Sequence, residues 1–346
     1  MADRVSSIEI LAEPPKPFFY LSFQRMSRLR LRPNTAAQSA FYVFSDNKGF
    51  TSPTSSGKVG QRRNEVVRNE GERLRRVVVC APRSEYFQVE NPEAHNIGEA
   101  ADRTKATAQH AQLRSVLRRS GAKVVNLPEL AGHPNSVFAR DTALLTPAGY
   151  VRLRMGLPTR RGEEEWMAAA LDSLGVPCAG KIEKPGTVEG GDVILAGEVV
   201  FVGLSERTNR SGVRQLSQIL NGLGFEVRTL SLTLPHLHIG GAMSVVGPRA
   251  VVCCRGVFPR SFLEGYETVE IPCPEDASAN VIALGNRGVI VEKRCVGTAQ
   301  ALLKSGFRVH LIDLSEFVKG RGGPTCLILP VDRTSPGKGR GERIKK

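Results

Sequence analysis

The sequence has 346 residues, 41% apolar and 24% charged, which is ordinary for a globular protein with a sizeable core. Its net charge of +14 first suggests a nucleic-acid binder, but residues 1–70 carry 11 Lys/Arg against 6 Asp/Glu, and residues 331–346 carry 6 against 2. Most of the excess therefore lies in the flanks. No basic stripe alternates with aromatic residues, which argues against nucleic-acid binding, and no apolar run approaches the roughly 18 residues of a membrane span.

The cysteines bear on the compartment. There are seven, an odd number without a C-x-x-C pair, which argues against a disulfide framework and a structural zinc site and favours a reducing compartment. We therefore expect a cytoplasmic protein. The adjacent Cys253 and Cys254 are interpreted as core residues.

The first part of the chain shows little sustained periodicity. Residues 1–71 are interpreted as a disordered extension or as the product of a mis-assigned start site. Residues 26–45 are rich in Arg and Ser and hold no acid, as in a transit peptide, but no amphipathic helix is clear. We expect one folded domain over residues 72–334 and a flexible basic tail over 335–346.

Order begins with the buried-strand pattern LRRVVVCA at Leu74–Ala81, and a repeat follows it. In four places an amphipathic helix stops at a glycine and a strand starts at once: LRRSGAKVVNLP, LDSLGVPCAGKI, LNGLGFEVRTL and LLKSGFRVHLIDL. A fifth, FLEGYETVEIP, has the same ending after a much shorter helix. The glycines that would end these helices are Gly121, Gly175, Gly224, Gly265 and Gly306.

Two further strand candidates joined by a turn precede each of these helices, as in GGDVILAGEVVFVG. The unit is therefore strand-turn-strand-helix-strand, about 45 residues long and present about five times. Such a period predicts a ring of equivalent modules, a five-bladed pseudo-symmetric α/β propeller. The last module would be completed by pairing Cys326–Pro330 with the strand near Val77.

Polar residues open the first strand of each module. In chain order they are Asn135 to Asp141, Glu189 to Asp192, His238, Asn280 and Cys326. In a ring, corresponding positions converge on the axis, so we expect these side chains to meet in one pocket. Taken singly each signal is modest, since Asp141 suits a turn and Cys326 beside Leu-Ile-Leu suits a core. His236 would point to the same strand face as His238 and competes with it.

A cysteine, a histidine and a carboxylate form the general pattern for nucleophilic catalysis. An ordinary thiol has a pKa of about 8.5, so a nearby imidazolium or a bound cation is needed to keep Cys326 as thiolate. Additional carboxylates in the same pocket suit a cationic substrate, because a buried cation needs a partner. A guanidinium is the obvious candidate, since it is planar and matches carboxylate oxygens in pairs.

The motifs PNSVFARD, VEGGDV, GLSERTN, LHIGGAMSVVG, ANVIALGNRG and GGPTC together resemble the dimethylarginine dimethylaminohydrolase family, whose superfamily includes arginine deiminases and amidinotransferases. The resemblance runs from about Leu74 to Pro330. It implies the same propeller, a guanidinium amino acid as substrate, and neither a metal nor an organic cofactor. It leaves the oligomeric state open, a homodimer included.

Position by position, the resemblance implies a role for seven residues, and an eighth, Asp192, is added as a candidate because the family's second acid is missing. Cys326 resembles the nucleophile, His238 the general acid and base, and Glu189 the acid that orients the histidine. Asp141 resembles the carboxylate that grips the guanidinium, and Asn135 a polar substrate contact. The arginines that hold the substrate's α-carboxylate correspond to Arg160 and Arg207, and Asp192 is a candidate for a second guanidinium acid.

Two departures leave the chain without the second guanidinium acid of either group, so that either Asp192 substitutes for it or the substrate differs. The family commonly carries Glu immediately before the gripping Asp, where this chain has Arg140. Arginine deiminases place Asp two residues after the catalytic histidine, where this chain has Gly240. The sequence thus predicts a hydrolase of N-methylated L-arginine that works through a covalent cysteine thiouronium. The alternatives are arginine deiminase or amidinotransferase activity in the same pocket, and a non-catalytic propeller whose basic tails bind a polyanion.

Overall fold

The computed structural model describes residues 67–232, 235–273 and 278–334. The predicted tail and nearly all of the predicted extension lie outside these ranges. Residues 67–71 do not: Val67, Asn69 and Glu70 are buried in the folded unit. The folded part therefore begins before residue 72, where the sequence interpretation placed its start. Among the described residues, no helix is both long and apolar enough to cross a membrane.

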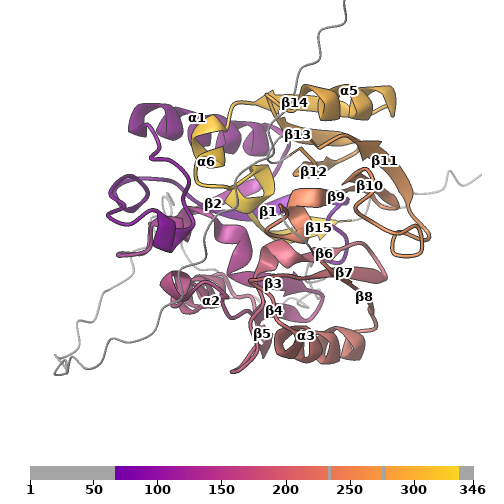
Figure 1. Ribbon diagram of the computed structural model, residues 1–346, viewed down its shortest axis with the longest axis horizontal. Coiled ribbons are helices and arrows are strands. Elements are labelled where there is room, and N and C mark those ends of the chain that lie inside the picture. Colours follow the sequence, from indigo (N-terminus) through magenta and orange to yellow (C-terminus); the bar gives the residue numbers. More distant parts are fainter. Residues whose placement is uncertain (1–66, 233–234, 274–277, 335–346) are drawn as a thin grey trace, which may run out of the picture. The chain divides into compact units, whose positions relative to one another are not determined.

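Five sheets of three strands each form the body, which confirms the five modules (Figure 1). In every sheet the middle strand runs antiparallel to one neighbour and parallel to the other. The sheets are β3 (Ala143–Thr146), β4 (Gly149–Arg152) and β5 (Cys178–Lys181); β6 (Val193–Leu195), β7 (Val199–Leu204) and β8 (Glu226–Ser231); β9 (Met243–Gly247), β10 (Ala250–Cys254) and β11 (Glu267–Ile271); β12 (Ile282–Gly285), β13 (Gly288–Glu292) and β14 (Arg308–Ile312); and β15 (Leu329–Thr334), β1 (Arg73–Cys80) and β2 (Lys123–Leu127).

The ring closes as the repeat predicts. β15 is the last strand of the chain, yet it pairs antiparallel with β1, and Val77 lies opposite Pro330. β9 packs beside both β6 and β12, and β15 packs beside β3. First strands of successive modules are thus neighbours at the centre. Figure 1 shows the helices α1 (Arg103–Arg119), α2 (Glu163–Ser173), α3 (Arg210–Gly222) and α5 (Val296–Lys304) at the periphery.

Helices and helical turns connect the strands. The helices are α1 (Arg103–Arg119), α2 (Glu163–Ser173), α3 (Arg210–Gly222), α4 (Ile239–Ala242), α5 (Val296–Lys304) and α6 (Ser315–Val318). The 3-10 turns are η1 (Glu85–Phe87), η2 (Glu93–His95), η3 (Pro134–Val137), η4 (Ala139–Asp141), η5 (Pro158–Arg160), η6 (Gly190–Asp192) and η7 (Pro324–Leu327). The amphipathic pattern of α3 holds, because Val213, Leu216 and Leu220 are its buried apolar side chains.

The predicted helix-ending glycines have the left-handed backbone that such a role requires, with φ between +74° at Gly175 and +93° at Gly121. One module differs from the prediction. Its second and third strands, β10 and β11, are joined by turns, and the described residues between them form no helix before Gly265. The glycine there ends a turn, which demands the same φ as a helix end.

One disulfide corrects the interpretation of the cysteines. Cys254, at the end of β10, is bonded to Cys273, which lies just beyond the end of β11. Because β10 and β11 run parallel and Cys254 lies opposite Ile271, their ends meet although 19 residues separate the two cysteines. Cys253 is free and buried in the core as expected. The odd number of cysteines was therefore no argument against a disulfide, since Cys254 and Cys273 are bonded.

Candidate active site

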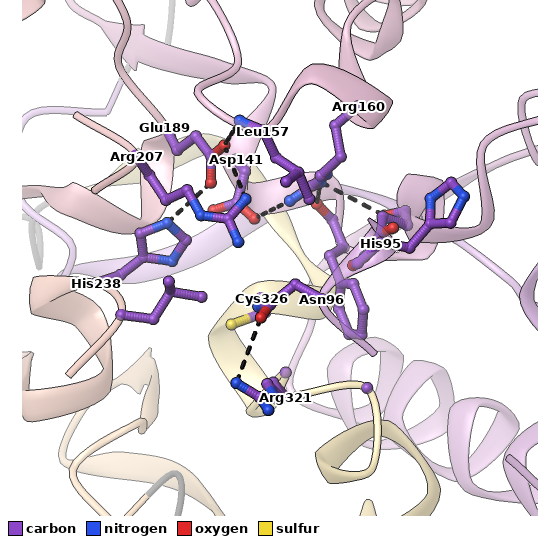
Figure 2. Close-up of a pocket in the computed structure, with 15 residues that line it drawn as sticks. His95, Asn96, Asp141, Leu157, Arg160, Glu189, Arg207, His238, Arg321 and Cys326 are labelled. Atoms are coloured by element: carbon purple, nitrogen blue, oxygen red, sulfur yellow. Dashed lines mark hydrogen bonds and ion pairs between the residues drawn. The ribbon is translucent and has the colours of Figure 1, made fainter. Parts of the chain in front are cut away.

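Short helical turns precede the first strands and carry the predicted site residues into one pocket (Figure 2). Asp141 ends η4, Glu189 and His238 immediately precede η6 and α4, and Cys326 lies in η7. η6 contacts both η4 and α4, and η4 contacts η7. Positions that the repeat makes equivalent thus converge, although 185 residues separate the first from the last.

The Gly-Gly of VEGGDV allows these turns to approach each other. A Cβ atom at Gly191 would lie 2.6 Å from Nδ1 of His238 and 2.9 Å from Oδ1 of Asp141. Any side chain there would push the histidine and the aspartate apart. By itself the glycine pair suggests only the start of a hairpin. In the structure, glycine is required at Gly191 because His238 and Asp141 pack against its backbone.

His238 is held by Glu189. Its Nε2 lies 2.9 Å from Oε2 of the carboxylate, and the other oxygen, Oε1, accepts the backbone N–H groups of Gly156 and Leu157 at 2.9 and 3.0 Å. Glu189 is 1% exposed, so these donors replace the water that it loses. The arrangement fixes both the position of the imidazole and the proton-bearing state of the nitrogen that faces Glu189.

The acids around His238 determine its charge. Burial alone would lower the pKa of His238, but Asp192, Asp141 and Glu189 outweigh it and raise the pKa to about 9. Burial likewise opposes the charge on Glu189, yet its hydrogen bond to His238 and the nearby Arg160 hold its pKa at about 2. At neutral pH the site therefore contains an imidazolium bound to a carboxylate.

Asp141 is engaged on both oxygens. Its Oδ2 accepts from Nη1 of Arg160 at 2.6 Å, and its Oδ1 accepts the N–H of Gly191 at 2.9 Å. Arg160 also donates to Glu163 at 2.7 and 3.0 Å and to the carbonyl of Phe138 at 3.1 Å. Glu163, in the first turn of α2, is fully buried. Arg160 is thus paired with both Asp141 and Glu163 before any ligand binds, although burial raises the pKa of Glu163 to about 7 against the effect of Arg160.

Arg207 is less engaged than Arg160. Its Nη1 lies 3.9 Å from Oε1 of Glu189, and no shorter side-chain contact of its guanidinium is found within the described residues. Asn135 also lines the pocket: its Nδ2 donates to the carbonyl of His95 at 3.1 Å, while its buried Oδ1 accepts nothing from the described residues. These two side chains present the donors and the acceptor that a polar ligand can occupy.

Cys326 is a free, partly buried thiol on the pocket wall. Burial raises the pKa of Cys326, and Asp141 adds to this, to about 11, although Arg140 and Arg160 oppose the shift. In the unliganded site the sulfur is therefore a thiol at neutral pH. A cation bound beside it would favour the thiolate.

Asp192 and His236 do not line the pocket. Asp192 is fully buried behind His238, where its oxygens accept the N–H of Ile239 at 3.0 Å and the hydroxyl of Ser205 at 2.6 Å. It contacts the histidine's own turn and leaves no oxygen facing a ligand. The structure thus brings His238, not its competitor His236, to the pocket.

The two departures from the family pattern have structural explanations. Arg140 points away from the pocket and donates to both oxygens of Glu70 at 2.6 and 3.0 Å. At Gly240, a Cβ would lie 2.9 Å from the carbonyl oxygen of Gly191, so an aspartate would not fit without a backbone shift. Neither position supplies a second guanidinium acid.

Several pocket residues were not identified from the sequence: His95, Asn96, Phe138, Leu157, Leu237 and Arg321. His95, Asn96, Leu157 and Arg321 come from loops outside the repeat register, whereas Phe138 and Leu237 lie beside register positions but are apolar and carry no chemical signal. Arg321 donates to Oδ1 of Asn96 at 3.3 Å across the mouth. The cavity measures only about 30 Å³, whereas ligand pockets usually need several hundred. An amino-acid substrate therefore enters only if wall residues such as Arg321 move.

Asp141, Glu189 and His238 place a possible metal-ligand atom each within 4.8 Å of one another. The oxygens that such an ion would use are already engaged by Arg160, by backbone N–H groups and by the histidine itself. The donor set therefore fits an acid-base network better than a cation site. The predicted absence of a metal stays a prediction.

Comparisons with known proteins agree with this geometry. The sequence profile of the family described as "N,N dimethylarginine dimethylhydrolase, eukaryotic" matches residues 84–333. The N(G),N(G)-dimethylarginine dimethylaminohydrolase of Pseudomonas aeruginosa is 30% identical over 228 residues, 66% of this chain and 89% of that protein. An uncharacterized protein of Aeropyrum pernix is 34% identical over 232 residues, 66% of this chain and 84% of that protein.

Solved structures show the same architecture. A dimethylarginine dimethylaminohydrolase adduct with S-methyl-L-thiocitrulline has a TM-score of 0.66 and 26% identity, covering 74% of this chain and 99% of that chain. The N-terminal domain of ArgZ, an arginine dihydrolase from cyanobacteria, has a TM-score of 0.65 and 20% identity, covering 75% and 98%. The second likeness shows the fold alone. Together they identify the five modules as the α/β propeller of this superfamily.

Proposed function

This chain belongs to the dimethylarginine dimethylaminohydrolase family of guanidino-group hydrolases, and from this premise we propose that it converts N-methylated L-arginine to L-citrulline and methylamine or dimethylamine. One observation carries the proposal: Cys326, His238 with Glu189, Asp141 and Arg207 line a single pocket. A nucleophile, a proton donor, a carboxylate for a cation and a cation for a carboxylate are the groups that this reaction needs.

Substrate binding follows from the charges. The guanidinium binds to Asp141, taking over part of the role that Arg160 has in the empty site. The α-carboxylate binds to Arg207, whose nearest described acid is 3.9 Å away, with Arg160 as the second cationic group. Asn135 offers its unoccupied Oδ1 to an N–H group of the substrate. In this mode the substrate satisfies groups that are only partly satisfied without it.

The bound cation prepares the nucleophile. Since the pKa of Cys326 is raised to about 11 in the empty pocket, first by burial and then by Asp141, the thiol does not ionise unaided at neutral pH. A guanidinium on Asp141 brings one positive charge beside the sulfur, which offsets the negative charge of that carboxylate, so the thiol releases its proton to solvent. The nucleophile is thus activated only when a substrate is present.

The first chemical stage is C–N cleavage. The sulfur of Cys326 forms a bond to the guanidinium carbon, and the imidazolium of His238 donates its proton to the methylated nitrogen. The bond between that nitrogen and the carbon then breaks, dimethylamine or methylamine leaves, and a cationic S-alkylthiouronium remains on the cysteine. Glu189 stabilises the imidazolium before this transfer and holds the ring during it.

The second stage is hydrolysis. Neutral His238 takes a proton from water, and the resulting hydroxide attacks the thiouronium carbon. The C–S bond breaks and the sulfur leaves as thiolate, while the hydroxyl group of the tetrahedral intermediate releases its proton to solvent and becomes the carbonyl of the ureido group of L-citrulline. Water is the only co-substrate, so the steps balance without a redox or organic cofactor. The cytoplasmic location expected from the cysteine count stays a prediction, and the Cys254–Cys273 disulfide argues against a reducing compartment.

The proposal is tested by measuring citrulline release from asymmetric dimethylarginine, monomethylarginine and arginine in parallel. We expect turnover of the methylated substrates and none above background in Cys326→Ser. His238→Ala should lose a similar share of the rate, whereas His236→Ala should keep it, because only His238 lines the pocket.

Other results would lead elsewhere. Citrulline from arginine alone would identify an arginine deiminase, and transfer of the amidino group to an added amine would identify an amidinotransferase. Turnover that survives in Cys326→Ser would exclude the covalent mechanism. Binding of a polyanion without any turnover would favour the non-catalytic alternative.

A further inference from the structure

We propose that Asn280 is a positioning residue for the nucleophile: its carboxamide fixes the turn that carries Cys326 and directs an N–H group at the sulfur. Asn280 immediately precedes the strand pair of its module and is 3% exposed. It does not line the pocket and has no place in the steps described above. The inference rests on the proposed role of Cys326.

The oxygen of Asn280 binds the cysteine turn. Oδ1 accepts the backbone N–H of Thr325 at 2.7 Å and the hydroxyl of Thr325 at 2.9 Å. Two donors on this atom identify it as the oxygen of the amide, because an NH₂ group at the same place would face two hydrogens. The residue before Cys326 is thus held at two points by one side chain.

The nitrogen binds on the other side. Nδ2 donates to the carbonyl of Gly240 at 3.0 Å and lies 3.8 Å from the sulfur of Cys326. Gly240 is two residues after His238, so one carboxamide links the turn of the nucleophile to the turn of the acid. All four hydrogen-bonding positions of the amide are used, which leaves it one orientation.

Packing supports the same conclusion. A Cβ atom at Gly323 would lie 2.6 Å from Cγ of Asn280, so the backbone of the cysteine turn presses directly on the carboxamide. The glycine of GGPTC, which seemed only to turn the chain, makes room for Asn280. Burying a carboxamide is unfavourable unless it is hydrogen-bonded, and here its hydrogen bonds fix the turn that carries Cys326.

The N–H group aimed at the sulfur has a chemical consequence. A donor favours the thiolate over the thiol, and it acts in a pocket where Asp141 disfavours the thiolate while Arg140 and Arg160 favour it. Asp141, Arg160 and His238 line the pocket with the sulfur, Arg140 acts on it from behind the pocket, and Asn280 is the neutral donor that touches it. Removing that donor should make the thiol harder to ionise without altering the substrate's contacts.

The test is the rate at which iodoacetamide alkylates Cys326, followed at the peptide level from pH 6 to 10 in Asn280→Asp, Asn280→Ala and Asn69→Asp. Asn69 is the matched control: it is 4% exposed, bridges Gly71 and Pro248 through its amide and lies away from the pocket. Because the pKa of Cys326 lies at about 11, above this range, the rate at each pH follows the small thiolate fraction. We expect that rate to fall at least about tenfold in Asn280→Asp, less in Asn280→Ala, and not at all in Asn69→Asp.

Steady-state kinetics should divide in the same way. kcat should fall at least about tenfold in Asn280→Asp while KM changes less than about twofold, because no substrate contact is removed. An alkylation profile equal to that of the unmodified chain in a folded Asn280 variant would overturn the proposal. So would loss of folding in both Asn280 variants while Asn69→Asp folds, since the residue would then serve the fold and not the sulfur. Alkylation needs no turnover, so failure of the proposed function would show separately in the citrulline assay.

Discussion

Arg140 and Asp141 are consecutive residues in one helical turn, and each forms a buried ion pair with an N···O distance of 2.6 Å, yet on opposite sides of that turn. Asp141 pairs with Arg160 in the wall of the pocket. Arg140 pairs with Glu70 behind the pocket, beside small cavities that do not reach Cys326. The length of an ion pair therefore says nothing about its role, and the surroundings must decide.

The Arg140–Glu70 pair, called the inner pair below, forms further hydrogen bonds to other groups of the protein. Besides Glu70, Arg140 donates to the carbonyls of Gly190 and Val193, and the N–H of Leu195 donates to Glu70. These contacts join the segment before β1, the first strand module and the second, so the pair holds modules together. The Asp141–Arg160 pair, called the outer pair below, lines the cavity, where either side chain can bind a ligand in place of the other. We infer that the inner pair serves stability and the outer pair serves binding.

The largest expected effect breaks the inner pair. Glu70→Gln leaves the buried charge of Arg140 without its counterion and should lower the free energy of unfolding by about 3–5 kcal/mol. kcat/KM of the folded fraction should stay within about threefold, because neither residue lines the pocket. Chemical denaturation and citrulline release measure the two quantities on one sample.

Two controls sharpen this result. Replacing both partners, as Glu70→Leu with Arg140→Met, should recover most of the lost stability, since no unpaired charge remains. A chain that starts at Glu72 lacks Glu70 and the buried Val67 and should lose at least as much as Glu70→Gln, whereas a start at Arg62 keeps both. Equal stability of the two truncated chains would contradict the structural role of residues 67–71.

Breaking the outer pair should lower the activity more than the stability. Asp141→Asn removes the carboxylate that binds the guanidinium, and kcat/KM should fall by about 10²–10³-fold. The loss of stability should be smaller than for Glu70→Gln, because Arg160 keeps its two hydrogen bonds to Glu163. If Asp141→Asn lost stability and not activity, the assignment of the two pairs would be reversed.

This contrast marks how far the sequence could predict the molecule. The repeat predicted the propeller, and its register predicted that Asp141, Glu189, His238 and Cys326 meet, because equivalent positions in a ring converge. Register cannot say which way a side chain turns. Arg140 and Asp141 occupy the same turn, and only the placement of Glu70 in three dimensions shows that one faces inward and the other outward.

Contacts between modules are the other limit. The N–H groups of Gly156 and Leu157 that hold Glu189 belong to the preceding module, and their closeness to Glu189 depends on loop geometry that leaves no periodic trace. The Cys254–Cys273 bond lies within one module, but no periodic signal in the sequence marks it either. Asn280 is an intermediate case. Its place in the register was visible, but its role required the positions of Thr325 and Gly240.

The smallest expected effect concerns Asp192. It is buried like the inner pair, which serves stability, but it lies next to His238 of the active site. Its negative charge is the strongest of those that raise the pKa of His238 to about 9 against the effect of burial. kcat/KM should therefore decline as pH rises through about 9, where His238 loses the proton that the leaving amine needs. Asp192→Asn removes the charge, lowers the pKa of His238 and moves this alkaline limb to lower pH, with KM at pH 7 changed less than about twofold.

The measurement is the pH profile of kcat/KM in both proteins. A raised KM with an unmoved limb would instead mean that Asp192 contacts the substrate as its second acid, the role predicted for it from the sequence.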